Sequence, residues 1–330
     1  MKLTTLAAFF GAALALPSAR PSARACTNPT VRKEWRNATV SDRLAYLSAA
    51  VCITKSPPRV GYHPNATLQD EFAFIHAILS NTDTPIHIHG VPAFLPWHRF
   101  FLRVYEDALH DCGYTGPALY WDFVHDAPAP SRSPIWDPVT GFGGNGAEPN
   151  SNPSGPFGPH GPRVVDGPFK DYRPLYFGQA VSPHDLSRNW VPADPFEGGA
   201  EMVGGNYNAT VMERVFAETT FAGFRASLEV PHNDVHTGVG GGPGSEGGLG
   251  DLGANTASPN DPVFFLLHGG VDRLWWLWQQ QNPSAEYDGV DQNNRSVTVD
   301  DVLPMMGLAE DGVVADYLDV NSPGLCYTYE

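Results

Sequence analysis

Two clusters of histidine constrain this chain more than any other feature of its sequence. The first consists of His76 and the segment HGVPAFLPWH at residues 89–98. The second consists of HNDVH at residues 232–236 and, after a glycine-rich stretch, His268. Each cluster offers three imidazoles, and at least one of the three lies on a segment that is predicted to be helical. Two matched three-histidine sites in one chain indicate a fold that brings two metal ions face to face.

The spacing of the histidines indicates how each site can form. His232 and His236 share one face of a helix, because residues four apart are neighbours at 3.6 residues per turn. His268 can complete that site from the following helix, since metal ligands in helical bundles come from facing helices. The other site draws its ligands from two helices and the loop between them, and these ligands are His76, His98 and His89.

The donor set narrows the choice of metal. Three neutral imidazoles, with no carboxylate or thiolate at matching spacing, suit copper or zinc better than magnesium, calcium or an iron–sulfur cluster. Ligand type alone leaves zinc as a rival to copper. Five other histidines match no ligand position and are expected on the surface or as satisfied core residues: His63, His110, His125, His160 and His184.

Apolar residues recur at a helical spacing in several segments, which predicts a mainly helical domain with little strand. Proline and glycine dominate residues 126–201, and this region is interpreted as a long irregular excursion because metal ligands lie on both sides of it. The glycine-rich segment 238–253 is expected to be a loop, which either borders the mouth of the site or forms only a surface turn. The predicted helices are 31–51, 68–79, 96–110, 208–218, 221–229 and 261–278.

The first 25 residues are interpreted as a secretory signal with a short pro-segment rather than as part of the fold. Lys2 is followed by an apolar run over 3–16, and Ala13-Leu-Ala15 has the small-x-small pattern of a cleavage site. No other segment is apolar for long enough to cross a bilayer. We therefore expect a secreted protein in which residues 26–330 form one domain.

The cysteines agree with an oxidising compartment. There are four of them, which allow three disulfide connectivities, and the sequence does not choose among these. We favour Cys26–Cys326, which would tie the two ends of the mature chain together, with Cys52–Cys112 as the second bridge. The sequence also contains four acceptor sites for N-glycosylation, at Asn37, Asn65, Asn208 and Asn294.

The net charge of −16 argues against a nucleic-acid-binding protein. Contacts to phosphates need clustered lysine and arginine, and no basic patch is visible in the sequence. The composition is that of an acidic soluble protein, with neither nucleic acid nor a membrane expected as its partner.

Two longer segments carry a family resemblance. HGVPAFLPWHRFF at 89–101 and SPNDPVFFLLHGGVDRLWWLWQ at 258–279 resemble the two copper-binding signatures of the tyrosinase and catechol oxidase family. The likeness is greatest to the short secreted fungal polyphenol oxidases, and it runs from VRKEWR at 31–36 to CYTYE at 326–330. In the last segment, Tyr327 and Tyr329 resemble the tyrosine motif that closes the catalytic domain in this family.

This resemblance implies a four-helix bundle around a dinuclear copper site, decorated by long loops. One copper would be bound by His76, His89 and His98, and the other by the three histidines of the second cluster, His232, His236 and His268. His87 is a rival of His76, because spacing upstream of the second ligand varies within the family. His87 also stands where many members have a cysteine in thioether linkage to that ligand, so this chain cannot form the crosslink.

The resemblance also assigns helpers to the metals. Glu229 and Asn233 would hold a water molecule that takes the phenolic proton; the alternative is a surface charge and a helix cap. Asp272 is expected to accept the free N–H of a ligand imidazole. Phe264 is expected to pack against ligand rings, and Gly269 to shape the mouth.

Other residues of these motifs are given structural roles. Phe94 and Trp97 are interpreted as core residues. Arg32 or Arg36 is expected to hold Tyr327 or Tyr329 against the core.

The function that the resemblance implies is a secreted dicopper oxidase that uses O2 to convert o-diphenols to o-quinones. Hydroxylation of monophenols, and activity on aminophenols, stay open. The main alternative is a hemocyanin-like oxygen-binding protein without turnover, which we rank second because carriers cover their copper with a further domain. A zinc hydrolase and an acidic structural glycoprotein follow. We expect a monomer whose partners are small phenols.

Overall fold

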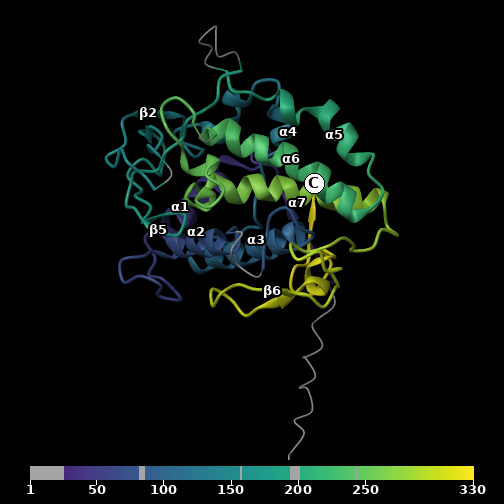
Figure 1. The fold of residues 1–330 in the computed structure, drawn as a ribbon. Coiled ribbons are helices and arrows are strands. Elements are labelled where there is room, and N and C mark those ends of the chain that lie inside the picture. Colours follow the sequence, from purple (N-terminus) through teal and green to yellow (C-terminus); the bar gives the residue numbers. More distant parts are fainter. Residues whose placement is uncertain (1–25, 82–85, 157, 194–200, 243) are drawn as a thin grey trace, which may run out of the picture.

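The computed structural model describes residues 26–330 except 82–85, 157, 194–200 and 243, so the predicted signal segment lies outside the described residues. The fold is mainly helical, and four long helices form the bundle that the sequence predicts. α7 runs through the middle of the molecule, with α6 above it and α2 and α3 below it in Figure 1. The bundle helices are α2 (Leu68–Leu79), α3 (Phe94–Asp111), α6 (Phe221–Gly240) and α7 (Val263–Gln281).

Local signals explain where several helices begin. Thr67 and Asp70 form a capping box at the start of α2, in which each side chain satisfies a backbone N–H of the other residue. Thr220 caps α6 in the same position through its hydroxyl. The predicted bounds of 68–79 therefore match the structure. The helices outside the bundle are α1 (Val40–Ile53), α4 (Phe123–Asp126) and α5 (Ala209–Phe216).

The prediction of a helix over 31–51 is wrong at its start. Residues Thr30–Arg32 form strand β1, which pairs in parallel with the C-terminal strand β8 (Tyr327–Tyr329). The helix begins only at Val40, behind the N-cap Thr39. The apolar side chain of Trp35 is fully buried from a turn rather than from a helix face, which is why periodicity misplaced the boundary.

Strands are few and short, as predicted, and each belongs to a two-stranded pair. Apart from β1 and β8, the three pairs are antiparallel and decorate the loops between and beyond the helices. These pairs are β2 (Gly146–Glu148) with β3 (Arg163–Val164), β4 (Tyr176–Phe177) with β5 (Ala180–Val181), and β6 (Val302–Leu303) with β7 (Gly312–Val313).

The glycine-rich segment 238–253 is not entirely a loop. Its first three residues complete α6, and its last three form a 3-10 turn at Asp251–Gly253. A Cβ on Gly240 would lie 1.9 Å from the backbone nitrogen of Gly253, so the helix end and this turn touch through glycine backbone. Glycine at positions 240 and 253 therefore allows the turn to pack closely against the end of α6, the helix that carries His232 and His236.

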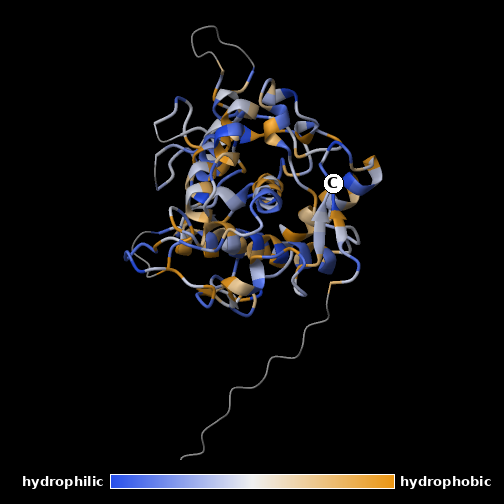
Figure 2. Cartoon of the chain, turned by 90° about the vertical axis from the view of Figure 1, so that its right-hand side faces the viewer, coloured by the Kyte–Doolittle hydropathy of each residue, from blue (hydrophilic) through white to orange (hydrophobic). Residues whose placement is uncertain are grey.

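One continuous hydrophobic core fills the bundle. It is rich in aromatic rings, and Phe72 at its centre has ring contacts with Phe101, Tyr105 and Phe265. In the side view of Figure 2 one helix is seen end-on at the centre, with the other elements around it. Among the described residues, no helix is long and apolar enough to span a membrane.

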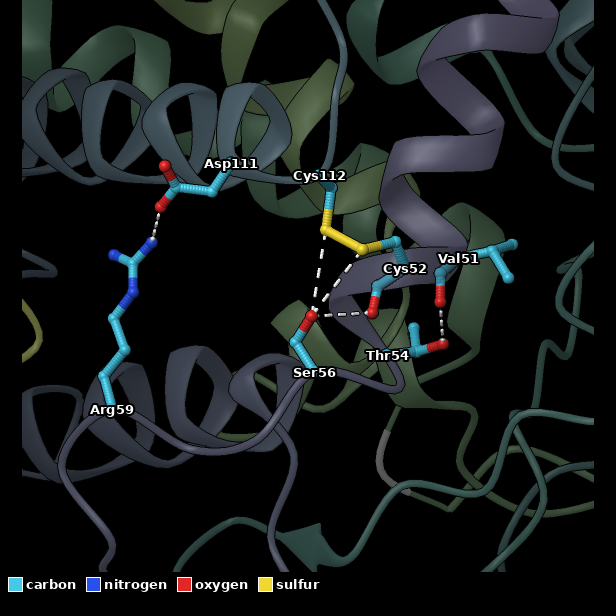
Figure 3. Close-up of a disulfide and its surroundings, with 7 residues drawn as sticks. All are labelled: Val51, Cys52, Thr54, Ser56, Arg59, Asp111 and Cys112. Atoms are coloured by element: carbon cyan, nitrogen blue, oxygen red, sulfur yellow. Dashed lines mark hydrogen bonds and ion pairs between the residues drawn. A yellow bond between two sulfur atoms is a disulfide. The ribbon is translucent and has the colours of Figure 1, made fainter.

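Two disulfides link segments at the edge of the bundle, and both pair the cysteines as favoured from the sequence. Cys26–Cys326 joins the segments next to the paired strands β1 and β8. Cys52–Cys112 joins the last turn of α1 to the end of α3, with the Ser56 hydroxyl in contact with both sulfurs (Figure 3).

A buried ion cluster joins α3 to α7. The Asp272 carboxylate of α7 accepts from Arg99 Nε of α3 at 2.6 Å, and Arg32 Nη1 of β1 lies 3.5 Å away. The hydroxyls of Tyr327 and Tyr329 donate to the same carboxylate, and the Arg32 guanidinium lies over the Tyr327 ring. The expected contact between an N-terminal arginine and the terminal tyrosines is thus made by Arg32.

The arginines of this cluster shift the pKa of Asp272 downward. Burial raises the pKa of Asp272, but the charges of Arg99 and Arg32 outweigh it and hold that pKa below the ordinary value. A depressed carboxyl pKa stabilises the fold above the pKa of the unfolded chain, and this contribution is lost as the pH falls through the folded pKa. The cluster is therefore at full strength at neutral pH.

We predict that Asp272→Ala lowers the free energy of unfolding by about 3–5 kcal/mol, because it leaves the buried Arg99 guanidinium without the carboxylate it pairs with, whereas Arg32 keeps its ion pair with Glu106 at 2.7 Å. The measurement is urea denaturation at pH 7. The matched control is Asp111→Ala, which breaks the exposed ion pair with Arg59 and should cost at most about 1 kcal/mol. Equal losses in the two variants would contradict a special role for the buried cluster.

Candidate metal centre

The structure gathers the first three histidines into one group. His76 comes from α2 and His98 from α3, while His89 lies in the segment between these helices. One ligand atom of each ring can be chosen so that all three lie within 4.8 Å of one another. The Nε2 atoms of His76 and His98 are 3.4 Å apart. His76, not His87, joins the other two in this group.

The second group is equally compact. His232 and His236 lie one turn apart on α6, and their Nε2 atoms are separated by 3.0 Å. His268 of α7 approaches them from the facing helix, with its Nε2 atom 3.2 Å from that of His232 and 3.3 Å from that of His236. The helix continues through Pro231, so the four-residue spacing keeps both rings on one face.

The two groups face each other across the bundle. The rings of His98 and His268, one from each group, are stacked with centroids 4.4 Å apart and an interplanar angle of 11°. Phe264, as expected, lies against ligand rings, and its centroid is 4.1 Å from that of His268 and 5.2 Å from that of His76. Phe94 is buried as predicted but also touches both groups, through His98 and His232.

Backbone carbonyls orient two of the rings from outside. His98 Nδ1 lies 2.8 Å from the carbonyl oxygen of Phe94, and His236 Nδ1 lies 2.8 Å from that of Leu252. A ring that donates its Nδ1–H to a carbonyl leaves the Nε2 lone pair for a metal. The sequence pattern did not reveal these carbonyls, because any residue type supplies one.

The Leu252 carbonyl is itself held by a buried network. The adjacent Asp251 carboxylate accepts from Asn260 Nδ2 and from the backbone and hydroxyl of Ser187, and it pairs with His184 Nε2 at 2.8 Å. His184 is therefore a satisfied core histidine, as predicted. The His184–Asp251 pair fixes the turn that contacts the second metal group.

The interior keeps all six imidazoles neutral. Burial is the largest cause of a lowered pKa for every one of them, and it lowers the pKa of His236 to about 4. Neighbouring imidazoles lower the pKa of the other five further. Neutral rings with free lone pairs form two groups to which, in the part of the chain that the structure describes, no carboxylate or thiolate is added, and this donor set fits two copper ions.

A cavity of about 400 Å³ opens beside the first group. His89, Glu229 and Asn233 are among the residues that line it, together with His87 and Ser80. Asn233 is exposed on the outer side of α6, whereas the Glu229 side chain is buried. The predicted pair thus borders a space that a small molecule could enter next to the metal ligands.

Glu229 is tied to the loop that carries His89. Its Oε1 accepts from the backbone N–H of Gly90 at 2.7 Å, and its Oε2 lies 2.8 Å from Arg225 Nη1. Burial raises the pKa of Glu229, while these two partners oppose the shift without cancelling it. A buried carboxylate with a raised pKa at the edge of a cavity is suited to accept a proton.

Two sequence-based roles are wrong. Asp272 does not accept from a ligand imidazole, because its carboxylate oxygens are engaged by Arg99, Arg32 and the terminal tyrosines. Gly269 does not shape the mouth: a Cβ there would lie 3.0 Å from Tyr120 Cβ, on the side of α7 that faces residues 119–121. Both positions serve helix packing behind the ligands.

Comparison with known proteins agrees with this geometry. The family profile "Common central domain of tyrosinase" matches residues 66–281, more than half of the chain. Tyrosinase-like protein phomQ1 of Diaporthe leptostromiformis is 36% identical over 329 residues, covering 92% of this chain and 78% of that protein. Tyrosinase ustQ of Aspergillus flavus is 34% identical and covers 92% of this chain and 80% of its own length. The chain therefore belongs to the tyrosinase family.

Solved structures place the fold in the same group. A polyphenol oxidase from Thermothelomyces thermophila, solved as a point mutant, superposes with a TM-score of 0.72 at 26% identity, covering 92% of this chain and 89% of that chain. A functional unit of octopus hemocyanin superposes with a TM-score of 0.58 at 21% identity, which is a likeness of fold alone. That alignment covers 91% of this chain and 68% of the hemocyanin chain.

We predict that His98→Ala and His268→Ala each reduce the bound copper from two ions to one per chain, because each removes one ligand of one group. The measurement is elemental analysis of copper-loaded, gel-filtered protein. The control is His110→Ala, which removes an exposed histidine outside both groups and should retain two ions. Two ions in either ligand variant would refute the assignment.

Proposed function

We propose that this protein is a dicopper oxidase that uses O2 to oxidise o-diphenols to o-quinones. The observation that carries the proposal is the pair of three-histidine groups that face each other beside a cavity of about 400 Å³, which the half-buried His89 lines. Membership of the tyrosinase family supports copper over zinc, which the imidazoles alone would also accept. When bound, the copper pair would supply the redox chemistry with O2.

The protein's own residues have separable tasks in this proposal. The six neutral imidazoles hold the metals without adding charge, so either copper oxidation state is tolerated. Glu229 is placed to take the phenolic proton, directly or through a water held with Asn233, because both line the cavity next to His89. Its hydrogen bond to Gly90 N–H keeps the carboxylate at the edge of the first group.

An oxygen carrier is the second candidate, since a hemocyanin unit shares the fold. The cavity reaches His89, so a phenol has access to a ligand residue. The relatives that match over most of the chain have names that indicate enzymes, including "N-acetyl-6-hydroxytryptophan oxidase ivoB" of Emericella nidulans at 28% identity. These observations favour turnover.

We further propose that the protein is secreted as a monomer, with residues 1–25 removed. The two disulfides support an oxidising compartment. Three of the four glycosylation sites are exposed, and Asn208 is half-buried at the N-cap of α5. N-terminal sequencing and intact mass of the protein from culture medium test this proposal, and an intact Met1 would contradict it.

We predict O2 uptake with catechol by the copper-loaded protein. A parallel assay with tyramine decides between the two activities that stay open. Uptake with both substrates, after a lag for tyramine, would identify a tyrosinase, and uptake with catechol alone would identify a catechol oxidase. No uptake with either substrate, despite two bound coppers, would contradict the proposed oxidase and favour the carrier.

We predict that Glu229→Gln lowers kcat with catechol by about 100-fold or more while retaining two coppers, since it removes the proton acceptor but no metal ligand. The measurement is steady-state O2 uptake together with the copper content. The control is Glu213→Gln on α5, which changes an exposed glutamate outside the cavity and should leave kcat unchanged. Full activity of the Glu229 variant would remove this residue from the mechanism.

A further inference from the structure

His89 differs from the other five ligand histidines in its support. The others lie on α2, α3, α6 or α7, where the backbone hydrogen bonds of a helix fix the position of the ring's Cα. His89 lies in the non-helical segment that leads into α3, next to Gly90, whose φ is +70°. An imidazole on such a segment needs an outside partner to point at a metal in one orientation.

Ser80 is that partner, and it contacts two ligands at once. Its Oγ atom lies 3.2 Å from His89 Nδ1 and 3.3 Å from His76 Nδ1. Ser80 is the C-cap of α2, and its backbone N–H donates to the His76 carbonyl at 2.8 Å. The hydroxyl is therefore held by the helix that carries one ligand, and it reaches across to the ligand that has no helix.

The hydrogen-bonding capacity of a hydroxyl makes this contact specific. One serine oxygen has two acceptor lone pairs, so it can accept an Nδ1–H from both imidazoles at the same time. Both rings then carry their proton on Nδ1 and leave Nε2 bare. If the hydroxyl donated to one ring instead, that ring would carry its proton on Nε2 and could not bind a metal through that atom; for His76, this Nε2 lies 3.4 Å from Nε2 of His98.

We propose that Ser80 is a positioning residue of the first metal group, whose hydroxyl oxygen sets the tautomer of both His76 and His89. It joins the loop ligand to α2, while the Glu229–Gly90 hydrogen bond joins the same loop to α6. The first group therefore depends on a side chain that binds no metal. This inference rests on the two histidine groups being metal sites, and not on which phenol is oxidised.

The direct test reads the tautomers in metal-free protein. Long-range 1H–15N spectra of protein labelled with 15N-histidine distinguish Nδ1–H from Nε2–H rings. We expect wild type to show Nδ1–H for His76 and His89, and Ser80→Ala to show a mixture of tautomers at both. Ser80→Thr retains the hydroxyl and should restore the wild-type pattern. An Nε2–H ring at either position in wild type, or unchanged tautomers in Ser80→Ala, would overturn the proposal.

A second measurement follows the metal itself. In competition with a chelator, Ser80→Ala should weaken the first Cu(II) site by about 10- to 100-fold and leave the second unchanged, with Ser80→Thr close to wild type. The matched control is Ser131→Ala, which removes a half-buried hydroxyl bonded to Glu201 and should change neither site. Equal weakening of both sites would overturn the proposal in favour of a general loss of structure.

These measurements fail separately from the proposed oxidase activity. If copper-loaded wild type fails to oxidise catechol but shows the expected Nδ1–H tautomers, which Ser80→Ala disturbs, the result counts against the proposed function but not against the role of Ser80. Catechol oxidation by wild type with unchanged tautomers in Ser80→Ala would count against Ser80 alone.

Discussion

The ion pair between Arg99 and Asp272 is the interaction on which the site depends most. Arg99 directly follows the ligand His98 on α3, and Asp272 lies one turn beyond the ligand His268 on α7. Both partners are buried, so separating them would leave uncompensated charges in a medium of low dielectric. The two helices therefore cannot slide or rotate freely against each other. The ion pair therefore also fixes the helix positions from which the rings of His98 and His268 stack on each other.

The chemistry of the centre depends on an interior that excludes charge from the ligands. Two buried acids near the bundle are engaged elsewhere, Asp272 by arginines and Asp251 by His184, and among the residues that the structure describes no carboxylate joins either histidine group. Burial then keeps the imidazoles neutral, carbonyls contact Nδ1 of His98 and His236, and the Ser80 hydroxyl contacts Nδ1 of His76 and His89. Among the described residues that line the cavity, Glu229 is the one acid, and it is buried with a raised pKa. The histidine groups and the proposed proton acceptor are thus separate side chains, although Glu229 bonds to the loop that carries His89.

The sequence-based predictions were accurate where neighbouring residues decide the structure, and wrong where residues distant in the chain decide it. α2 was predicted at its true bounds, because its capping box and its apolar face are local patterns. The start of α1 was misplaced, because residues 30–32 pair with a strand that lies 297 residues further along the chain. Asp272 was assigned to the wrong partner for the same reason. Its spacing from His268 is visible in the sequence, but the arginines that engage it come from two other segments.

By itself, the sequence determined five of the six ligands and how they group, the helical class of the fold and the family, because spacing on a helix and signature motifs are properties of neighbouring residues. It also indicated Glu229, Asn233 and Phe264. Only the tertiary structure decided that His76 rather than His87 completes the first group, and that Ser80 and the Leu252 carbonyl stand behind the rings. The reason is physical: a hydrogen bond to a ligand needs an oxygen at the right place, and many residue types can supply one. Such a partner is recognised only when the chain has folded and brought it there.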